Sequence, residues 1–273
     1  MHLLKKILDF YITGSIHVAL SVYALVRMTQ FTFGIFDACE VAYFAFFGTI
    51  VGYNFVKYDA LARTTKAPIS SQIKVFAVFS FISFLAAAYF FLQLQMITKG
   101  IALAFLILTM LYTLPFFPNK SNARNWAGVK IYIVTLCWVG VTVFLPIINS
   151  ATPIFTIDVF LIALQRFILV FVLILIFEII DLKRDDPHLL TVPQQIGIKQ
   201  TKIIGSVLLL VFLILEFMDT DLRHQALLIK SGIAFTTFLF LLFANENRSK
   251  YYTSFWAESI PIVWWILLLL IFG

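Results

Sequence analysis

The chain has 273 residues, of which 62% are hydrophobic and 12% are charged. Soluble domains carry about a quarter charged residues, and a water-soluble fold of this length could not bury so much apolar surface in one core. The composition therefore excludes a soluble enzyme, a disordered chain and a disulfide scaffold, and it indicates a protein that lies in the lipid bilayer. The net charge is +6. Because the basic residues lie between apolar segments, they indicate membrane topology and contact with lipid phosphates, and we expect no nucleic-acid partner.

Nine apolar segments follow one another along the chain. They cover residues 10–29, 34–56, 73–94, 100–117, 127–148, 157–180, 201–218, 226–244 and 255–272. A transmembrane strand alternates polar and apolar residues, whereas stretches such as 167–180 are apolar on every side. The pattern predicts an all-α, polytopic membrane helix bundle of nine transmembrane helices. No Gly/Ser linker interrupts it, so we expect one domain over residues 1–273.

The distribution of Lys and Arg predicts the orientation of this bundle. The N-terminus and the connections after the even-numbered segments hold 15 of the 20 cations, the opposite side holds Arg27, Lys99, Arg223 and Lys230, and Arg166 lies inside a segment. An excess of Lys and Arg marks the cytoplasmic side. We therefore expect a cytoplasmic N-terminus and an external C-terminus, in the plasma membrane of the cell.

The end of the second segment carries Asn54, Lys57 and Tyr58 on neighbouring faces of one helical turn. These residues are compatible with a polar pocket. They are equally compatible with a helix end that has an interfacial tyrosine and a lysine reaching toward the lipid headgroups.

Several other polar residues lie within or between the apolar segments. Glu40 and Arg166 are of opposite charge in the second and sixth segments, and we expect them to pair, since an unpaired charge there costs about 3 kcal/mol. His17 has no partner visible from the sequence. Glu216, Asp219 and Asp221 predict an acidic, solvated outer loop.

Three carboxylates end the sixth segment. If the helix continues, Glu178, Asp181 and Asp185 fall at positions i, i+3 and i+7, on one face. Mg²⁺ is typically held by one or two carboxylates together with substrate phosphate, so this face is a candidate metal site. The alternative is a solvated helix end whose acids pair with Lys183 and Arg184.

The pattern E-x-x-D-x-x-x-D at Glu178, Asp181 and Asp185, followed by Thr191, Pro193 and Gly197, resembles the second aspartate-rich motif of UbiA-type membrane prenyltransferases. The resemblance implies a nine-helix bundle with two aspartate motifs on the cytoplasmic side, at helices 2 and 6. It also implies that Asp181 and Asp185 are catalytic ligands of Mg²⁺ and that Glu178 supports them. The substrates implied are an isoprenyl diphosphate and a small hydrophobic, aromatic acceptor.

The first motif of that family, N-D-x-x-D-x-x-x-D, is degenerate in this chain. Asn54 matches, but the three aspartate positions are Phe55, Tyr58 and Ala62, and Asp59 is one residue out of register. By the same resemblance, Tyr112 corresponds to a tyrosine near the end of helix 4. Lys57, Arg63 and Arg124 would then contact the diphosphate, with Lys120 as the alternative to Arg124, and Asn54 would remain in the substrate pocket.

Two other functions stay open at this point. The lost aspartates are compatible with a family member that binds a lipid diphosphate or a quinone without catalysis. A proton-coupled transporter would use Glu178 and Asp181, although the sequence reveals no pair of interrupted helices and no inverted repeat to support it.

Overall fold

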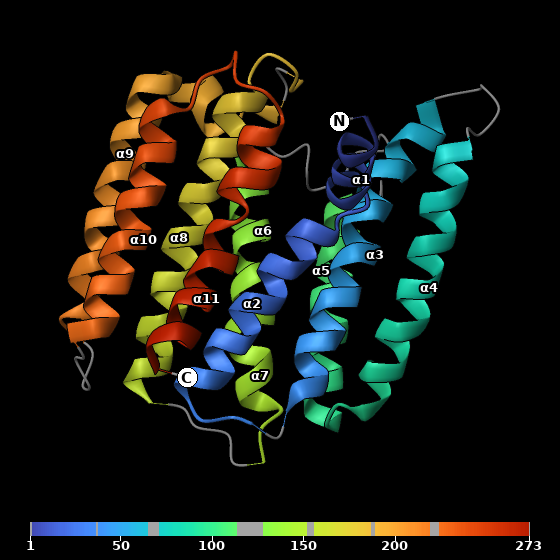
Figure 1. Cartoon of the computed structure of the whole chain (residues 1–273), viewed down its shortest axis with the longest axis horizontal. Helices are drawn as coiled ribbons and strands as arrows, with labels where there is room; N and C mark the ends of the chain where they lie inside the picture. Colours follow the sequence, from blue (N-terminus) through green and yellow to red (C-terminus); the bar gives the residue numbers. More distant parts are fainter. Residues whose placement is uncertain are drawn as a thin grey trace.

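The computed structural model describes residues 2–36, 38–64, 71–113, 128–151, 156–186, 189–218 and 224–272, and every regular element in these ranges is a helix. Two short π-helical stretches are labelled η. In chain order the elements are α1 His2–Thr13, α2 Ile16–Thr32, α3 Cys39–Thr64, α4 Ser71–Gln93, α5 Met96–Thr113, α6 Val129–Val139, η3 Gly140–Phe144, α7 Leu145–Ile148, α8 Ile157–Asp181, α9 Val192–Glu216, α10 His224–Phe243, η5 Tyr252–Ala257 and α11 Ile260–Phe272 (Figure 1).

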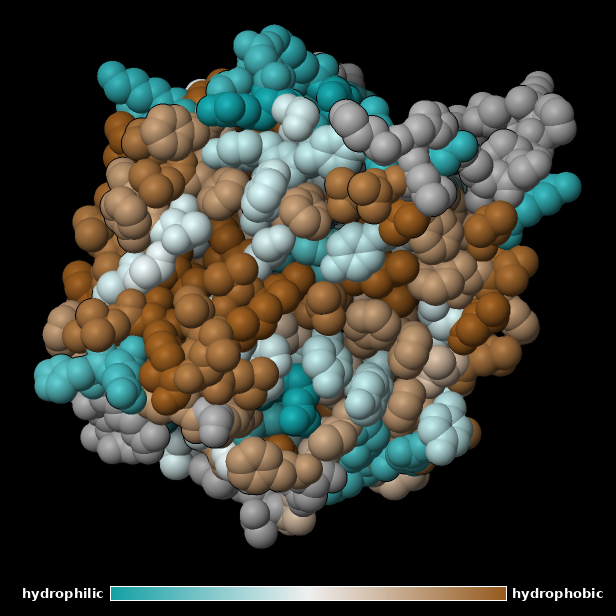
Figure 2. Space-filling model, viewed as in Figure 1, coloured by the Kyte–Doolittle hydropathy of each residue, from teal (hydrophilic) through white to brown (hydrophobic). Residues whose placement is uncertain are grey.

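The molecule is an integral membrane protein with several spans. Within the described ranges, seven helical stretches are long and apolar enough to cross a membrane: Cys39–Tyr58, Ile73–Gln93, Val129–Ile148, Ile157–Asp181, Val192–Glu216, His224–Phe243 and Tyr252–Phe272. An eighth span results if α1 and α2, bent by 60° relative to each other, count as one, while Met96–Met110 of α5 is shorter. Figure 2 shows hydrophobic side chains across the middle of the molecule and hydrophilic ones gathered toward both ends.

Two helix starts differ from the prediction. The first segment is broken at Gly14–Ser15, where Ser15 has a left-handed backbone (φ 63°) and separates α1 from α2. The seventh segment begins at Val192 and not at residue 201. Pro193 lies in the first turn, and the Thr191 N–H donates to Gln194 Oε1 (2.9 Å), which caps the helix. A polar first turn of this kind is invisible to a search for apolar residues.

Helix α8 is the most buried of the seven stretches that are long and apolar enough to cross a membrane. It packs against α6 and α9, α10 packs on α9, and α11 packs on both α10 and α2, while α2 contacts α3 and α3 contacts α4 (Figure 1). The unbroken apolar sequence of α8 fits this position because the helix is buried on most of its sides. The first helix starts at one end of the bundle, and the chain finishes at the opposite end (Figure 1).

The predicted Glu40–Arg166 pair is wrong. Arg166 Nη1 donates to the backbone oxygen of Leu25 (3.1 Å), and its guanidinium carbon lies 5.8 Å from the ring centroid of Trp264. Glu40 accepts a hydrogen bond from Asn149 Nδ2 at 2.6 Å. The Arg166 side chain therefore contacts α2, and it does not reach Glu40 on α3.

Glu216 is also not the solvated loop residue that its sequence position suggested. It is buried at the end of α9, where it forms an ion pair with Lys230 of α10 and accepts a hydrogen bond from Gln165 Nε2 (3.0 Å). Lys230 also donates to Gln165 Oε1 at 3.1 Å. The three side chains thus satisfy one another between α8, α9 and α10. Asp219 and Asp221 lie outside the described residues.

Candidate functional site

The three carboxylates at the end of α8 occupy one end of the bundle. The Asp185 N–H donates to the backbone oxygen of Asp181 (2.9 Å), so the chain continues for a further helical turn past the end of α8. Asp181 Oδ1 lies 3.9 Å from Arg184 Nη1, and Asp185 Oδ2 lies 4.0 Å from Lys130 Nζ at the start of α6. The electrostatic interaction between Asp181 and Asp185 is repulsive, and Lys130 opposes it.

Glu178 lies one helical turn before Asp181 in α8 and is buried. Its side chain is 2% exposed, and its Oε2 accepts a hydrogen bond from the Val192 N–H at 3.1 Å. The first N–H groups of a helix have no partner within the helix, so a carboxylate there satisfies one of them and suits the positive end of the helix dipole. Glu178 therefore fixes the start of α9 over the end of α8, with Lys130 as its nearby positive charge.

A hollow of about 300 Å³ adjoins this group between the starts of α6 and α9. It is lined by Gly128, Val129, Tyr132, Val192, Gln195 and Ile196. Gly128 has φ +69°, and Leu190, which precedes the cap of α9, is also left-handed (φ 44°). Val192 lines the hollow and donates its N–H to Glu178. Lys130 follows the lining residue Val129 and lies 4.0 Å from Asp185, so the hollow adjoins the carboxylates.

Asp181 and Asp185 offer two carboxylates to Mg²⁺, which is fewer ligands than an all-protein metal site needs. Among the residues described, no three His, Cys, Asp or Glu side chains meet as a metal site. Asp185 Oδ2, however, is a buried oxygen without a hydrogen-bond partner, and it stands one helical turn from Asp181. Two carboxylates supplemented by water and phosphate oxygens are the usual Mg²⁺ environment, whereas an all-protein cage is not.

Asn54 lies elsewhere at this end of the bundle, fully engaged in hydrogen bonds. Its Oδ1 accepts from Ser15 Oγ (2.8 Å), and its Nδ2 donates to the Gly14 backbone oxygen (3.3 Å) and to Ser80 Oγ (2.9 Å). Lys57 Nζ donates to the same Ser15 Oγ at 2.8 Å. The break between α1 and α2 is therefore held by Asn54 and Lys57 of α3, and Ser80 of α4 bonds the Asn54 amide.

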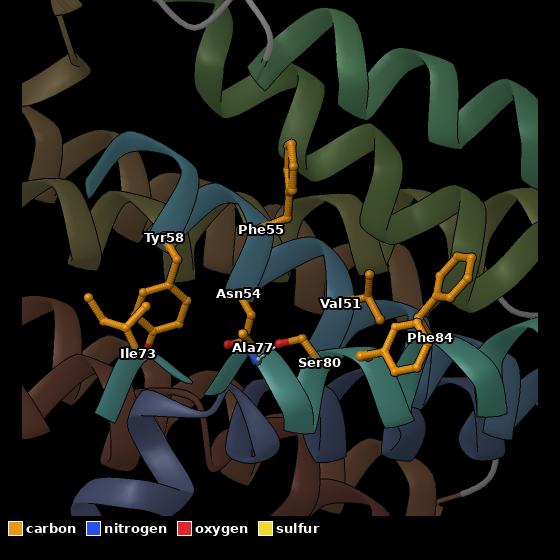
Figure 3. Close-up of a pocket in the computed structure, with 9 residues that line it drawn as sticks. Val51, Asn54, Phe55, Tyr58, Ile73, Ala77, Ser80 and Phe84 are labelled. Atoms are coloured by element: carbon orange, nitrogen blue, oxygen red, sulfur yellow. Dashed lines mark hydrogen bonds between the residues drawn. The ribbon is translucent and has the colours of Figure 1, made fainter. Parts of the chain in front are cut away.

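The degenerate first motif faces a groove between α3 and α4. This groove, of about 360 Å³, is lined by Val51, Asn54, Phe55, Tyr58, Ile73, Ala77, Ser80, Phe81 and Phe84. In Figure 3, Asn54 points toward Ser80 across the groove, and Tyr58 lies at its other end beside Ile73. Two positions at which the resemblance would place metal-binding aspartates, Phe55 and Tyr58, are therefore aromatic here.

A third polar group was missed by reasoning from the sequence. Tyr11 O–H pairs with His17 Nδ1 (2.8 Å), while His17 Nε2 bonds the backbone oxygen of Phe255 in η5 (2.8 Å) and lies 3.1 Å from Ser259 Oγ. Glu258 follows directly after η5. An acidic residue inside the predicted segment 255–272 was the available signal, because intramembrane acids are rare.

A further contact ties α1 to the residues before η5. Tyr251 O–H donates to Asp9 Oδ1 at 2.5 Å, and Lys250 Nζ lies 3.7 Å from the same oxygen. The hydrogen bond to Asp9 raises the pKa of the Tyr251 phenol, because ionisation would place two negative charges side by side. The first and last helices of the chain are thus joined at this end.

The predicted site residues fall into separate groups. Within the described ranges, no hydrogen bond or ion pair connects Asn54 and Lys57 with Glu178, Asp181 and Asp185. The side chains of Arg63 and Tyr112 lie outside the described residues, as do Lys120 and Arg124 entirely.

No protein-family model matches this chain, and no curated protein matches it in sequence. The chain is similar in structure to a solved protein reported under "Structural and mechanistic insights into the biosynthesis of Digeranylgeranylglyceryl phosphate synthase in membranes". The TM-score is 0.55 over 97% of this chain and 96% of the other, at 14% sequence identity. That structural neighbour is a UbiA-type membrane prenyltransferase. At this identity the likeness establishes a shared fold over nearly the whole of both chains.

Proposed function

We propose that this protein is an intramembrane prenyltransferase that moves an isoprenyl group from an isoprenyl diphosphate to a small aromatic acceptor. The observation that carries the proposal is the group of Glu178, Asp181, Asp185 and Lys130 at one end of a bundle that shares the fold of a membrane prenyltransferase.

Each member of the carboxylate group has a separate role. Asp181 and Asp185 would hold Mg²⁺, which would supply positive charge to the diphosphate. Lys130 binds a diphosphate oxygen directly as a cation, and Arg63 and Arg124 add to the positive charge at this end. Glu178 keeps the start of α9 in place through the Val192 N–H. Tyr112 and Asn54 belong to the pocket in the same proposal.

The topology we propose has nine spans, with the bent α1–α2 pair as the first and α5 as the fourth. The N-terminus is cytoplasmic and the protein resides in the plasma membrane. The excess of Lys and Arg at the end of the bundle that holds the carboxylates supports this orientation.

Membranes that contain the protein, incubated with radiolabelled geranylgeranyl or farnesyl diphosphate and a panel of aromatic acceptors, test the activity. We expect Mg²⁺-dependent transfer that falls at least 100-fold in Asp181→Asn and in Asp185→Asn, since each removes a charged metal ligand. The matched control is Glu246→Gln, a carboxylate at the same end that pairs with Lys183 (3.1 Å) outside the site. Equal transfer in all three variants would overturn the assignment.

A second candidate is a protein that binds a lipid diphosphate or a quinone without transferring a prenyl group. The aromatic groove at the first-motif positions favours it, because Phe55 and Tyr58 cannot hold a second metal ion. Binding of the labelled diphosphate without product across the whole acceptor panel is the outcome that favours this candidate over the enzyme.

A further inference from the structure

The groove between α3 and α4 runs along both helices for the depth of one lipid leaflet. Its lining residues form one stripe on each helix: Val51, Asn54, Phe55 and Tyr58 on α3, and Ile73, Ala77, Ser80, Phe81 and Phe84 on α4. Tyr58 and Ile73 stand at one end of the groove, and Val51 and Phe84 stand at the other (Figure 3). From Ile73 to Phe84 a helix rises by about 16 Å, and one leaflet makes up about half of the ~30 Å hydrocarbon core.

The groove opens sideways toward lipid. Helix α4 lies at the edge of the bundle, and its principal packing partner is α3 (Figure 1). The side chains of Phe55, Phe81 and Phe84 are 45%, 60% and 53% exposed. Exposed apolar side chains within a span contact acyl chains, so a chain can enter this groove directly from the bilayer.

One end of the groove, its mouth at Tyr58 and Ile73, lies at the membrane boundary. Tyr58 is the last residue of the stretch of α3 that is apolar enough to cross the membrane, and Ile73 is the first of the corresponding stretch of α4. The Tyr58 ring stacks on Phe76 with centroids 5.4 Å apart, and Phe10 of α1 stacks on the same Phe76 ring at 5.2 Å. Helix α1 therefore lies beside the mouth of the groove.

Two lysines flank this mouth. Lys74 follows Ile73 and lies three residues before Ala77, so it is on the groove side of α4. Lys6 lies one helical turn before Phe10, on the same side of α1. Both lysines are exposed, and in the described part of the chain neither forms a hydrogen bond or an ion pair. Lysines at the end of a span extend toward the headgroups and attract anionic lipid.

We propose that the groove between α3 and α4 is a binding site for one anionic phospholipid. An acyl chain of this lipid lies along the groove from Ile73 to Phe84, against the exposed aromatic rings. Its phosphate group lies at the mouth, where Lys6 and Lys74 bind it as cations. The lipid thereby fills the contact between α4 and the rest of the bundle.

The lining of the groove suits a phospholipid better than an isoprenyl diphosphate. No carboxylate lines the groove, so it offers no anionic ligand for the Mg²⁺ that accompanies a diphosphate. A phospholipid needs no metal ion, because two lysines suffice for the charge of one phosphate group. The polar groups of Asn54 are already bonded to Ser15, Gly14 and Ser80, so the Asn54 amide does not compete for the ligand. The inference is therefore independent of prenyl transfer.

Photo-crosslinking in vesicles tests the headgroup. The full-length protein is reconstituted in phosphatidylcholine that contains a small fraction of phosphatidylglycerol or phosphatidylcholine with a diazirine in one acyl chain, and crosslinked residues are identified by mass spectrometry. We expect at least fivefold more crosslinking to the groove residues with phosphatidylglycerol, because each lysine near an anionic headgroup favours binding about fivefold. This ratio should fall below about twofold in the double variant Lys6→Gln/Lys74→Gln. It should persist in the control Lys183→Gln, an exposed lysine at the same end that pairs with Glu246.

A pair of neighbouring substitutions tests the groove itself. Ala77 and Val78 are both exposed on α4, but only Ala77 lines the groove. We expect Ala77→Trp to fill the groove and to lower crosslinking there at least fivefold. Val78→Trp adds the same ring outside the groove and should leave the crosslinking within about twofold of the wild-type value.

Two outcomes in the wild-type protein would overturn the proposal, so a folding defect in a variant cannot mask its failure. Equal crosslinking of the two lipids would contradict the role of the lysines. Crosslinks spread evenly over the groove and over the exposed residues Val78 and Ile82 would mean that α4 contacts only the general lipid of the bilayer. Displacement of the phosphatidylglycerol probe by geranylgeranyl diphosphate would assign the groove to an isoprenyl diphosphate and overturn the assignment to a phospholipid.

Discussion

The buried polar group of Gln165, Glu216 and Lys230 lies at the end of the bundle opposite the α8 carboxylates. Glu216 is 1% exposed, and both its ion-pair partner Lys230 and its hydrogen-bond donor Gln165 come from other helices. Removal of one member of such a group leaves the other charge without compensation, which is more costly than the loss of the pair as a whole.

This difference predicts the result of a double-mutant cycle. Glu216→Leu and Lys230→Met should each lower the free energy of unfolding by about 3–5 kcal/mol, and the double variant should lose clearly less than their sum. Unfolding by SDS titration in mixed micelles measures the three variants. The exposed pair Lys183–Glu246 supplies the comparison, since variants there should cost about 1 kcal/mol or less. Single variants at 216 and 230 no more costly than those would contradict the burial argument.

Residue pairing was the least predictable level of this protein. The sequence places Glu40 and Arg166 within apolar segments, and charge alone suggested that they pair. The partner that a buried side chain obtains depends instead on which helix lies within its reach, which for Arg166 is α2 and for Glu40 is the turn at Asn149. His17 obtained its partner for the same reason, from a backbone oxygen in η5.

At the level of the helices, Gly140 explains how α5 packs against the π-helical η3. A Cβ atom built on Gly140 would lie 1.9 Å from Phe105 Cζ and 2.5 Å from both adjacent ring carbons. The Phe105 ring of α5 therefore sits directly on the backbone of η3, a contact that any side chain at this position would prevent.

We expect Gly140→Ala to destabilise the protein by about 1–3 kcal/mol, because the Phe105 ring must leave its position. The control is Gly232→Ala in α10, where nothing lies within 4 Å of the added Cβ and alanine should stabilise the helix by up to about 1 kcal/mol. Thermal unfolding in detergent measures both, and Phe105→Leu should restore part of the loss in Gly140→Ala. A neutral Gly140→Ala would show that the α5–η3 contact is not tight.

Helices were predicted well wherever the apolar sequence alone determines them. The predicted segment 157–180 matches α8 within one residue at each end. A continuous apolar sequence predicts a membrane helix whichever of its faces contact lipid and whichever contact protein. The π-helical stretches and the break at Ser15 were not predicted. They arise from contacts between distant helices, such as His17 with Phe255 and Ser15 with Asn54, which have no local signature.

Across the whole molecule, the carboxylate face of α8 was predictable because helical spacing alone aligns Asp181 and Asp185. The remaining parts of the candidate site were not, because they come from different spans. Lys130 of α6 lies 4.0 Å from Asp185, and the N–H group that Glu178 accepts from belongs to Val192 of α9. Only the packing order of the bundle reveals these neighbours, and helix periodicity carries no information about that order.

The distribution of charge over the two ends makes a prediction for the molecule as a whole. Lys183, just after α8, and Met218, just after α9, are both exposed and are separated by the single span α9. If the end with the excess of Lys and Arg is cytoplasmic, residue 183 faces the cytoplasm and residue 218 faces outward. Cysteines at these two positions, in a protein whose Cys39 and Cys137 are replaced by serine, report each side separately.

In sealed right-side-out vesicles, a membrane-impermeant maleimide should label Met218→Cys at once and Lys183→Cys only after permeabilisation. The protein without cysteines controls for background, and quantitative labelling of both variants in detergent confirms that each cysteine is reactive. The reverse pattern would invert the molecule and place the Asp181–Asp185 carboxylates outside the cell, which contradicts the proposed orientation. Labelling of both positions from one side would mean that α9 does not cross the bilayer.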